Sequence, residues 1–230
     1  MALAEELTAY VKSAFQNRWE TTVGRVVPDT AAIPLGNTAV ELESATVLYA
    51  DIDGSTLMVD QQPWSICAEI YKTFLHCAAK IIRSEDGTIT AYDGDRVMAV
   101  YIGDRKNSRA VRTALRINWA VQKIINPLFA AQYPQNDYRL RQVVGVDTSK
   151  LHVARTGVRG DNDLVWIGRA ANYAAKLTTL DSAYPTWITD AVYSVLTEDA
   201  KMYEGVSMWE ARDWTTMGGM RIHRSSWWRT

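Results

Sequence analysis

The chain has 230 residues, 47% of them hydrophobic, which is enough to bury a substantial core. Lysine and arginine number 25 against 26 aspartates and glutamates, so no net charge favours nonspecific binding to nucleic acid or an anionic membrane. No apolar run approaches a membrane span, and Glu5 and Glu6 stand where a signal peptide would be basic. We therefore expect a cytoplasmic globular protein that binds neither nucleic acid nor membrane.

Residues 1–43 are expected to form an N-terminal helix and an irregular lead-in. Apolar residues recur at helical spacing from Ala2 to Gln16. Residues 21–42 contain two prolines and two glycines without a sustained period. Residues 44–230 are expected to form one larger domain.

The larger domain is predicted to order its elements as strand, helix, strand, strand, helix, strand. That order predicts an α/β (α+β) ferredoxin-like fold, an antiparallel-rich sheet with helices packed on one face. After a first strand, the sequence predicts a helix over 64–82, a hairpin over 88–102 and a helix over 108–131. A strand over 140–153 follows, joined by a turn at 156–163 to a strand over 164–167. The remaining predicted elements are a helix over 169–180, a strand over 186–189, a short helix over 191–196, and strands over 206–212 and 220–226.

The first candidate site stretch is 45–56, ATVLYADIDGST, a buried strand that ends in acidic and hydroxyl residues. Side chains alternate along a strand, so Tyr49 and Asp51 share one face. The turn Gly54, Ser55 and Thr56 can present backbone N–H groups to an anion. A carboxylate beside an anion site predicts Mg²⁺ or Mn²⁺ holding a polyphosphate.

A second acidic tip lies in 88–102, where Asp93-Gly94-Asp95 gives the Asp-Gly signal of a tight hairpin. Asp51 and Asp95 would then stand at the ends of strands from distant parts of the chain. Two cations bridged by shared carboxylates are what two-metal phosphoryl transfer requires.

The third stretch, 168–177, reads GRAANYAAKL and predicts a helix crowded with alanine. Asn172 and Lys176 are spaced four residues apart and share one face. The small side chains around them indicate that this helix approaches another backbone closely.

Together these stretches resemble the class III nucleotidyl cyclases over residues 45–196. The family's strand motif F-x-D-I-x-G-x-T is matched at 49–56, its Gly-Asp hairpin at Gly94-Asp95, and its helix motif N-x-x-x-R at Asn172 through Lys176. The resemblance implies that 44–230 is the catalytic domain.

The resemblance also implies roles for individual residues. Asp51 and Asp95 would bind two Mn²⁺ or Mg²⁺ ions, with the Ile52 carbonyl as a further ligand. Asn172 would orient the ribose, and Lys176 would stand where the family has a transition-state arginine. Active sites would form at the interface of a head-to-tail homodimer, which would leave one subunit alone inactive.

The positions with which purine cyclases of this family read the base are Ala91 and Val165 here. Neither side chain can hydrogen-bond a base, which argues against an ordinary adenylate or guanylate cyclase. Tyr49 replaces the usual phenylalanine and adds a hydroxyl. The chain thus looks like the pyrimidine cyclases of bacterial Pycsar antiphage defence, which convert UTP, or CTP, to the second messenger cyclic UMP, or cyclic CMP. Arg96 is a candidate phosphate or base contact, although a hairpin position favours solvent.

Lys176 is the other departure, because lysine lacks the planar fork of arginine. Other cations that could complete the site are Arg169, Arg155 and Lys150. Two alternatives stay open: an adenylate cyclase that reads its base through backbone groups, and a degenerate cyclase domain that binds nucleotide without turnover.

Overall fold

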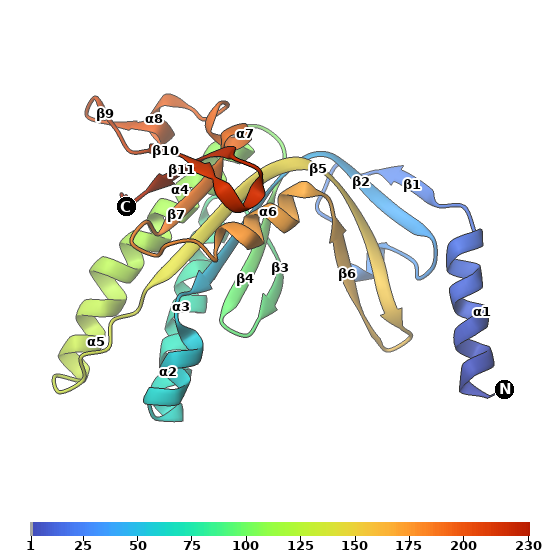
Figure 1. Cartoon of the computed structure of the whole chain (residues 1–230), viewed down its shortest axis with the longest axis horizontal. Helices are drawn as coiled ribbons and strands as arrows, with labels where there is room; N and C mark the ends of the chain where they lie inside the picture. The colour runs from blue at the N-terminus through green and yellow to red at the C-terminus, as the bar shows by residue number, and fades with distance from the viewer. Residues whose placement is uncertain (1) are drawn as a thin grey trace.

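The computed structural model describes residues 2–230, and this part of the chain contains both strands and helices (Figure 1). The strands are β1 (Glu20–Val23), β2 (Thr38–Ile52), β3 (Thr88–Asp93), β4 (Arg96–Tyr101), β5 (Gln142–Val158), β6 (Asp161–Ile167), β7 (Thr186–Thr189), β8 (Met202–Tyr203), β9 (Val206–Ser207), β10 (Glu210–Trp214) and β11 (Met220–Ser225). The helices are α1 (Leu3–Gln16), α2 (Ser55–Gln61), α3 (Trp64–Ser84), α4 (Lys106–Ala120), α5 (Asn126–Gln132), α6 (Arg169–Leu177), α7 (Asp190–Tyr193) and α8 (Glu198–Lys201).

A mixed sheet carries the fold. Its strand order is β10-β11-β7-β5-β2-β4-β3, with β1 added beside β2 and β6 beside β5. The central strands β2, β4 and β5 pair antiparallel, while β7 pairs parallel to β5. The antiparallel-rich sheet predicted from the order of elements is therefore present.

The two faces of the sheet bury different side chains. Leu48 and Ala50 of β2 lie in a core with α3 and α4, whereas Val47 lies in a second core with the alanines of α6. The prediction of helices on one face thus describes α3 and α4, and α6 lies on the opposite face. Tyr49 packs at the edge of the α6 core, so α6 covers the face that carries Tyr49 and Asp51.

The predicted irregular lead-in over 21–42 is wrong at both of its ends. Residues 20–23 form β1, which pairs parallel with the start of β2, and β2 itself begins at Thr38. β2 runs without a break through the expected boundary at 43/44, and its register against β5 shifts between Leu42 and Ala45. Prolines and glycines between the two strands concealed them in the sequence.

Other elements lie close to their predicted positions. The helix predicted over 64–82 is α3, the strand over 186–189 is β7, and the long helix over 108–131 is α4 and α5 joined by a π-helical turn, Val121–Ile125. The turn between β5 and β6 is shorter than predicted, because β5 continues to Val158 and β6 starts at Asp161. None of the helices in residues 2–230 combines the length and apolarity needed to cross a bilayer.

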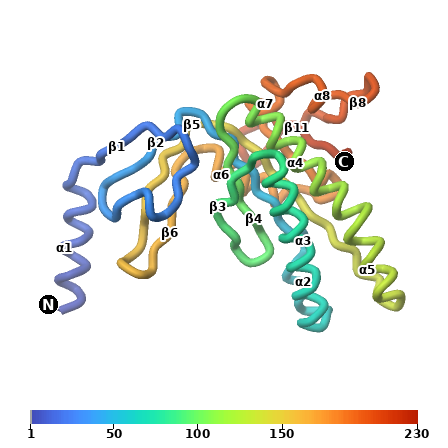
Figure 2. Tube along the Cα trace, turned by 180° about the vertical axis from the view of Figure 1, so that it is seen from behind, coloured from blue at the N-terminus to red at the C-terminus, as the bar shows by residue number. Residues whose placement is uncertain are grey.

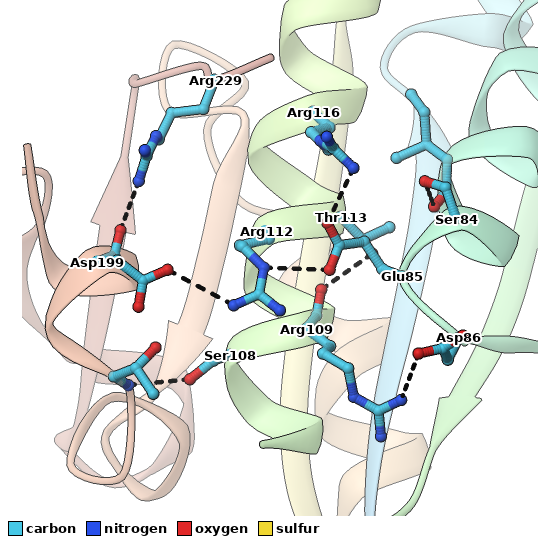
Figure 3. Close-up of polar contacts among 12 residues, drawn as sticks. Ser84, Glu85, Asp86, Ser108, Arg109, Arg112, Thr113, Arg116, Asp199 and Arg229 are labelled. Atoms are coloured by element: carbon cyan, nitrogen blue, oxygen red, sulfur yellow. Dashed lines mark hydrogen bonds and ion pairs between the residues drawn. The ribbon is translucent and has the colours of Figure 1, made fainter. Parts of the chain in front are cut away.

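A network of ion pairs ties α3, α4 and α8 together (Figure 3). Glu85, at the end of α3, is 9% exposed and accepts from Arg112 at 3.1 Å and Arg116 at 2.9 Å, both on α4. Arg112 also lies 3.6 Å from Asp199 of α8. The neighbouring pair between Arg109 and Asp86 is longer, at 3.4 Å, and the Asp86 side chain is 83% exposed.

We predict that Glu85→Gln lowers the free energy of unfolding by about 1–2 kcal/mol, because two partly buried guanidinium groups lose their shared anion. Asp86→Asn is the matched control, since asparagine tolerates the positive φ of 55° at that position. Its exposed pair should contribute less than about 0.5 kcal/mol. Urea titration of both variants measures the difference, and equal losses would contradict the assignment.

Candidate active site

Asp51 stands at the end of β2 on the face covered by α6. It pairs with Val143 of β5, and Thr178, directly after α6, lies with its hydroxyl 3.4 Å from Asp51 Oδ2. Burial raises the pKa of Asp51, and the negative charge of Asp95 raises it further. Two aspartates 44 positions apart in sequence therefore come close enough for their charges to interact.

Asp95 owes its place to the tight turn between β3 and β4. Gly94 has a φ of 62°, which the turn requires, and Asp93 pairs with Arg96 at 2.6 Å across it. The hairpin predicted from Asp93-Gly94 is present. Arg96 differs from expectation: it does not simply face solvent, because its guanidinium lies 5.7 Å from the centre of the Tyr49 ring.

Tyr49, Ala91 and Arg96 gather beside Asp51. Ala91 of β3 pairs with Met98 of β4, and Met98 pairs with Tyr49 of β2, so Ala91, Met98 and Tyr49 lie side by side across the three strands. Burial raises the pKa of the Tyr49 hydroxyl, although the positive charge of Arg96 lowers it in part. The tyrosine is therefore a neutral hydrogen-bonding group at physiological pH.

Val165 lies far from Tyr49, Ala91 and Arg96 of the same chain. It lies on β6 opposite Ala154, which pairs with Ala39 at the far end of β2. Ala39 and Asp51 are twelve residues apart on one strand, roughly 40 Å at 3.3 Å per residue. One chain alone thus separates the two positions at which related purine cyclases read the base.

The small-residue turn after Asp51 is the start of a helix that the sequence did not predict. Gly54 has a left-handed conformation, and α2 begins at Ser55, so the N–H groups of Ser55 and Thr56 fall in its first turn. Asp53 points elsewhere: it pairs with Arg141 at 3.0 Å and accepts from Ser182 at 2.7 Å. Asp53 is therefore charge-balanced, unlike Asp51.

Two residues that sequence reasoning missed border this turn. The exposed Arg141 guanidinium is 4.0 Å from where a Cβ on Gly54 would stand. Tyr71 of α3 lies near Ser55, and its pKa is raised by burial and by the charge of Asp95. Neither carries a local signal, because each reaches the turn only through tertiary packing.

Helix α6 lies unusually close to β5. A Cβ on Gly145 would stand 2.1 Å from the Ala174 carbonyl oxygen, so only glycine permits this contact. Ala170, Ala171 and Ala174 are buried against the sheet. The close backbone approach predicted from the alanine-rich sequence is present.

A buried ion pair fixes the first residue of α6. Asp147 is fully buried and accepts from Arg169 Nε at 3.0 Å and from the Thr189 hydroxyl. Burial raises the pKa of Asp147, and Thr189 and Arg169 oppose the shift. Arg169 is thus held by Asp147 within this chain, and its side chain is 42% exposed.

The other candidate cations are also engaged elsewhere. Arg155 donates to Asn162 at 2.7 Å, and Lys150 donates to Glu41 at 2.8 Å. Asn172 and Lys176 are both exposed on α6. The Lys176 amine lies 3.7 Å from Met217 Sδ, in the connection between β10 and β11. That connection is on the side of β5 opposite β4 and β3, and therefore away from Asp95.

The fold and these residues define a class of protein. The crystal structure of the adenylyl cyclase CyaB from P. aeruginosa superposes with a TM-score of 0.63 and 22% identity, covering 83% of this chain and 97% of that one. The architecture is therefore that of the class III nucleotidyl cyclases. No protein-family model matches the sequence.

Sequence comparison identifies the family within this class to which the chain is similar. A uridylate cyclase from Xanthomonas perforans is 54% identical over an alignment of 231 positions, which covers 100% of this chain and 99% of the relative. A uridylate cyclase from Burkholderia cepacia is 54% identical over 228 residues, covering 99% and 98%. The chain belongs to the uridylate cyclase family.

We predict that Asp51→Asn raises the free energy of unfolding at neutral pH by about 0.5–1 kcal/mol, a small amount because the carboxylate is partly solvated. The folded pKa lies above the usual value of 3.8, so the ionised form is disfavoured in the fold. The gain should be present above the folded pKa and vanish as the pH falls below 3.8, where both states are protonated.

Asp53→Asn is the matched control, because it removes favourable contacts with Arg141 and Ser182 and should lower stability by about 0.5–1 kcal/mol. Urea unfolding at several pH values in the absence of divalent ions measures both. A loss of stability in Asp51→Asn would contradict the electrostatic account of the site.

Proposed function

We propose that this protein converts UTP to 3′,5′-cyclic UMP and pyrophosphate, at sites that two copies of the chain complete together. The observation that carries the proposal is the approach of Asp51 to Asp95 next to Tyr49. Membership of the uridylate cyclase family supports the choice of substrate. CTP is the alternative substrate to be compared.

The site suits divalent cations supplied with the nucleotide. Among residues 2–230, no three or more His, Cys, Asp or Glu side chains cluster as a metal site. Mg²⁺ is commonly held by one or two carboxylates together with substrate phosphates, and Asp51 and Asp95, whose charges interact, fit that pattern. They and the Ile52 carbonyl would hold two Mg²⁺ or Mn²⁺ ions. Such ions, when bound, neutralise charge on the triphosphate and lower the pKa of the ribose 3′-hydroxyl.

The chain's own groups would hold the triphosphate. The N–H groups of Ser55 and Thr56 at the start of α2 and the exposed Arg141 guanidinium all border the turn that follows Asp51. N–H groups and a guanidinium are suited to phosphate oxygens. Tyr71, near Ser55, would help to fix the orientation of the turn.

The base would lie against Tyr49, Ala91 and Arg96. A small alanine at position 91 leaves no side-chain group to read a purine edge. The neutral Tyr49 hydroxyl and the Arg96 guanidinium supply a donor and a cation for the carbonyl oxygens of uracil. A site that hydrogen-bonds one base discriminates against bases that leave those groups unpaired.

A second copy would supply Asn172, Lys176 and Val165. Lys176 lies on the side of α6 away from Asp95, and Val165 lies at the distant end of the sheet. In the reaction, the 3′-oxygen attacks the α-phosphorus in line, the bond to the β-phosphate oxygen breaks, and the hydroxyl proton passes to solvent. Asn172 would orient the ribose, and the Lys176 ammonium would stabilise charge on the α-phosphoryl oxygens.

The direct test is incubation with each of ATP, GTP, CTP and UTP in the presence of Mn²⁺, followed by mass analysis of the products. We expect cyclic UMP as the main product and its loss, by more than about 100-fold, in Asp95→Ala. Binding of UTP without turnover would instead identify a degenerate cyclase domain. Equal turnover of ATP and UTP would identify an adenylate cyclase that reads its base through the backbone.

Mixing two inactive variants tests the shared site. Asp95→Ala and Lys176→Ala copies should each be inactive as purified. An equal mixture should recover about a quarter of wild-type activity, because half of the dimers are mixed and each has one intact site. No recovery on mixing would contradict completion by a second copy.

Tyr49→Phe tests base recognition. Removing the hydroxyl should lower kcat/KM for UTP by about 10-fold or more while changing that for ATP less, since only uracil recognition loses a partner. Tyr92→Phe, on the neighbouring β3–β4 hairpin and exposed, is the control. An unchanged ratio of UTP to ATP turnover would exclude Tyr49 from base selection.

A further inference from the structure

Helix α1 has apolar side chains but no core of its own. None of its 14 residues is buried, and Leu3, Leu7, Tyr10, Val11 and Phe15 are each between 47% and 86% exposed. An isolated helix of this length is only marginally stable in water, so helices of this size depend on packing. A surface is needed to cover α1.

The apolar residues of α1 form one stripe. Leu3, Leu7, Tyr10 and Ala14 follow the spacing of three and four residues that aligns side chains along a helix. Val11 and Phe15 widen the stripe on one side, and Glu6 borders it on the other. Lys12 lies on the opposite face. The helix therefore offers one defined contact surface.

The rest of the chain holds α1 away from its own helical layer. The side chain of Asn37 donates to the Ala14 carbonyl at 2.9 Å and to the Asn17 carbonyl at 2.8 Å, and β1 then pairs with β2. Figures 1 and 2 show α1 at one end of the long axis and α5 at the other, with the sheet between them. The stripe cannot reach α3 and α5 of the same chain.

An apolar groove of about 250 Å³ lies between α3 and α5. Ile70 and Ile125 form its buried floor, Leu128 on its rim is 66% exposed, and Cys77 of α3 lines it. Glu69 of α3 also lines the groove and accepts from the Tyr133 hydroxyl at 2.6 Å. The apolar stripe of α1 matches the apolar floor of this groove in polarity.

We propose that α1 of each copy docks into the α3–α5 groove of a second copy, so that the two chains exchange their N-terminal helices reciprocally. The contact is isologous and closes a two-fold dimer, which explains why both complementary surfaces are on one chain. This inference rests on the proposed function, which requires a dimer, and it names the surfaces that hold that dimer together.

The area is sufficient for a stable contact. Five large apolar side chains at roughly 100 Å² each, with the groove that receives them, bury on the order of 1,000 Å² per contact. Two such contacts reach the range of about 1,200–2,000 Å² or more that is typical of stable interfaces. The exchanged helices alone can thus hold two copies together.

Cysteine scanning of α1 against the native Cys77 tests the proposal. Leu3→Cys, Leu7→Cys and Tyr10→Cys sample the stripe along the helix, and a disulfide forms only where Cβ atoms come within about 4.5 Å. Burial raises the pKa of the Cys77 thiol, so oxidation is carried out at alkaline pH. At least one variant should give a covalent dimer on a non-reducing gel, reversed by reductant and lost when Cys77→Ser is added.

Lys12→Cys is the matched control on the opposite face of α1 and should give no Cys77-dependent dimer. Absence of cross-linking at all three stripe positions, equal cross-linking at Lys12→Cys, or an intramolecular product only would overturn the proposal. UTP turnover of the wild type and of each reduced variant is measured in parallel. Turnover without Cys77 cross-linking overturns the helix exchange alone, whereas no turnover by the wild type overturns the proposed function.

Discussion

The geometry of the candidate site depends on one position where a helix meets the sheet with no side chain between them. Gly145 leaves room for the Ala174 carbonyl, and any larger residue would stand in its place. Because α6 can lie this close, Thr178 at its end reaches Asp51. The pair between Arg169 and Asp147 holds the other end. The helix is thus fixed along its length relative to the strand that carries the candidate metal ligand.

Charges in the site are arranged differently from charges elsewhere in the fold. Glu85 forms ion pairs with two arginines of α4. Asp53, next to the site, pairs with Arg141 and accepts a hydrogen bond from the Ser182 hydroxyl. Asp51 has a long contact with Thr178, and burial and the like charge of Asp95 outweigh the favourable charge of Arg96. Two like charges held close together, in a fold whose other partly buried carboxylates have cationic partners, are typical of functional sites.

Short-range sequence patterns predicted the parts of the site that depend on local geometry. Alternation along a strand placed Tyr49 and Asp51 on one face, Asp-Gly predicted the hairpin that carries Asp95, and alanine content indicated the close packing of α6. The partners of these groups come from distant segments, as with Arg141 and Tyr71 at the turn after Asp51. The contact between the Arg96 guanidinium and the Tyr49 ring was not predicted. It depends on the pairing of β2 with β4, which no local sequence pattern specifies.

The strand order of the sheet has a consequence for the cell. With β7, β11 and β10 on one side of β5 and the candidate metal-binding tips on the other, the Lys176 amine lies away from the Asp51–Asp95 pair of its own chain, as the proposed shared site requires. A chain that relies on a second copy to finish its chemistry obeys mass action, so its specific activity falls on dilution. Signal output would then rise more steeply than expression, and a low copy number would by itself keep the messenger from accumulating.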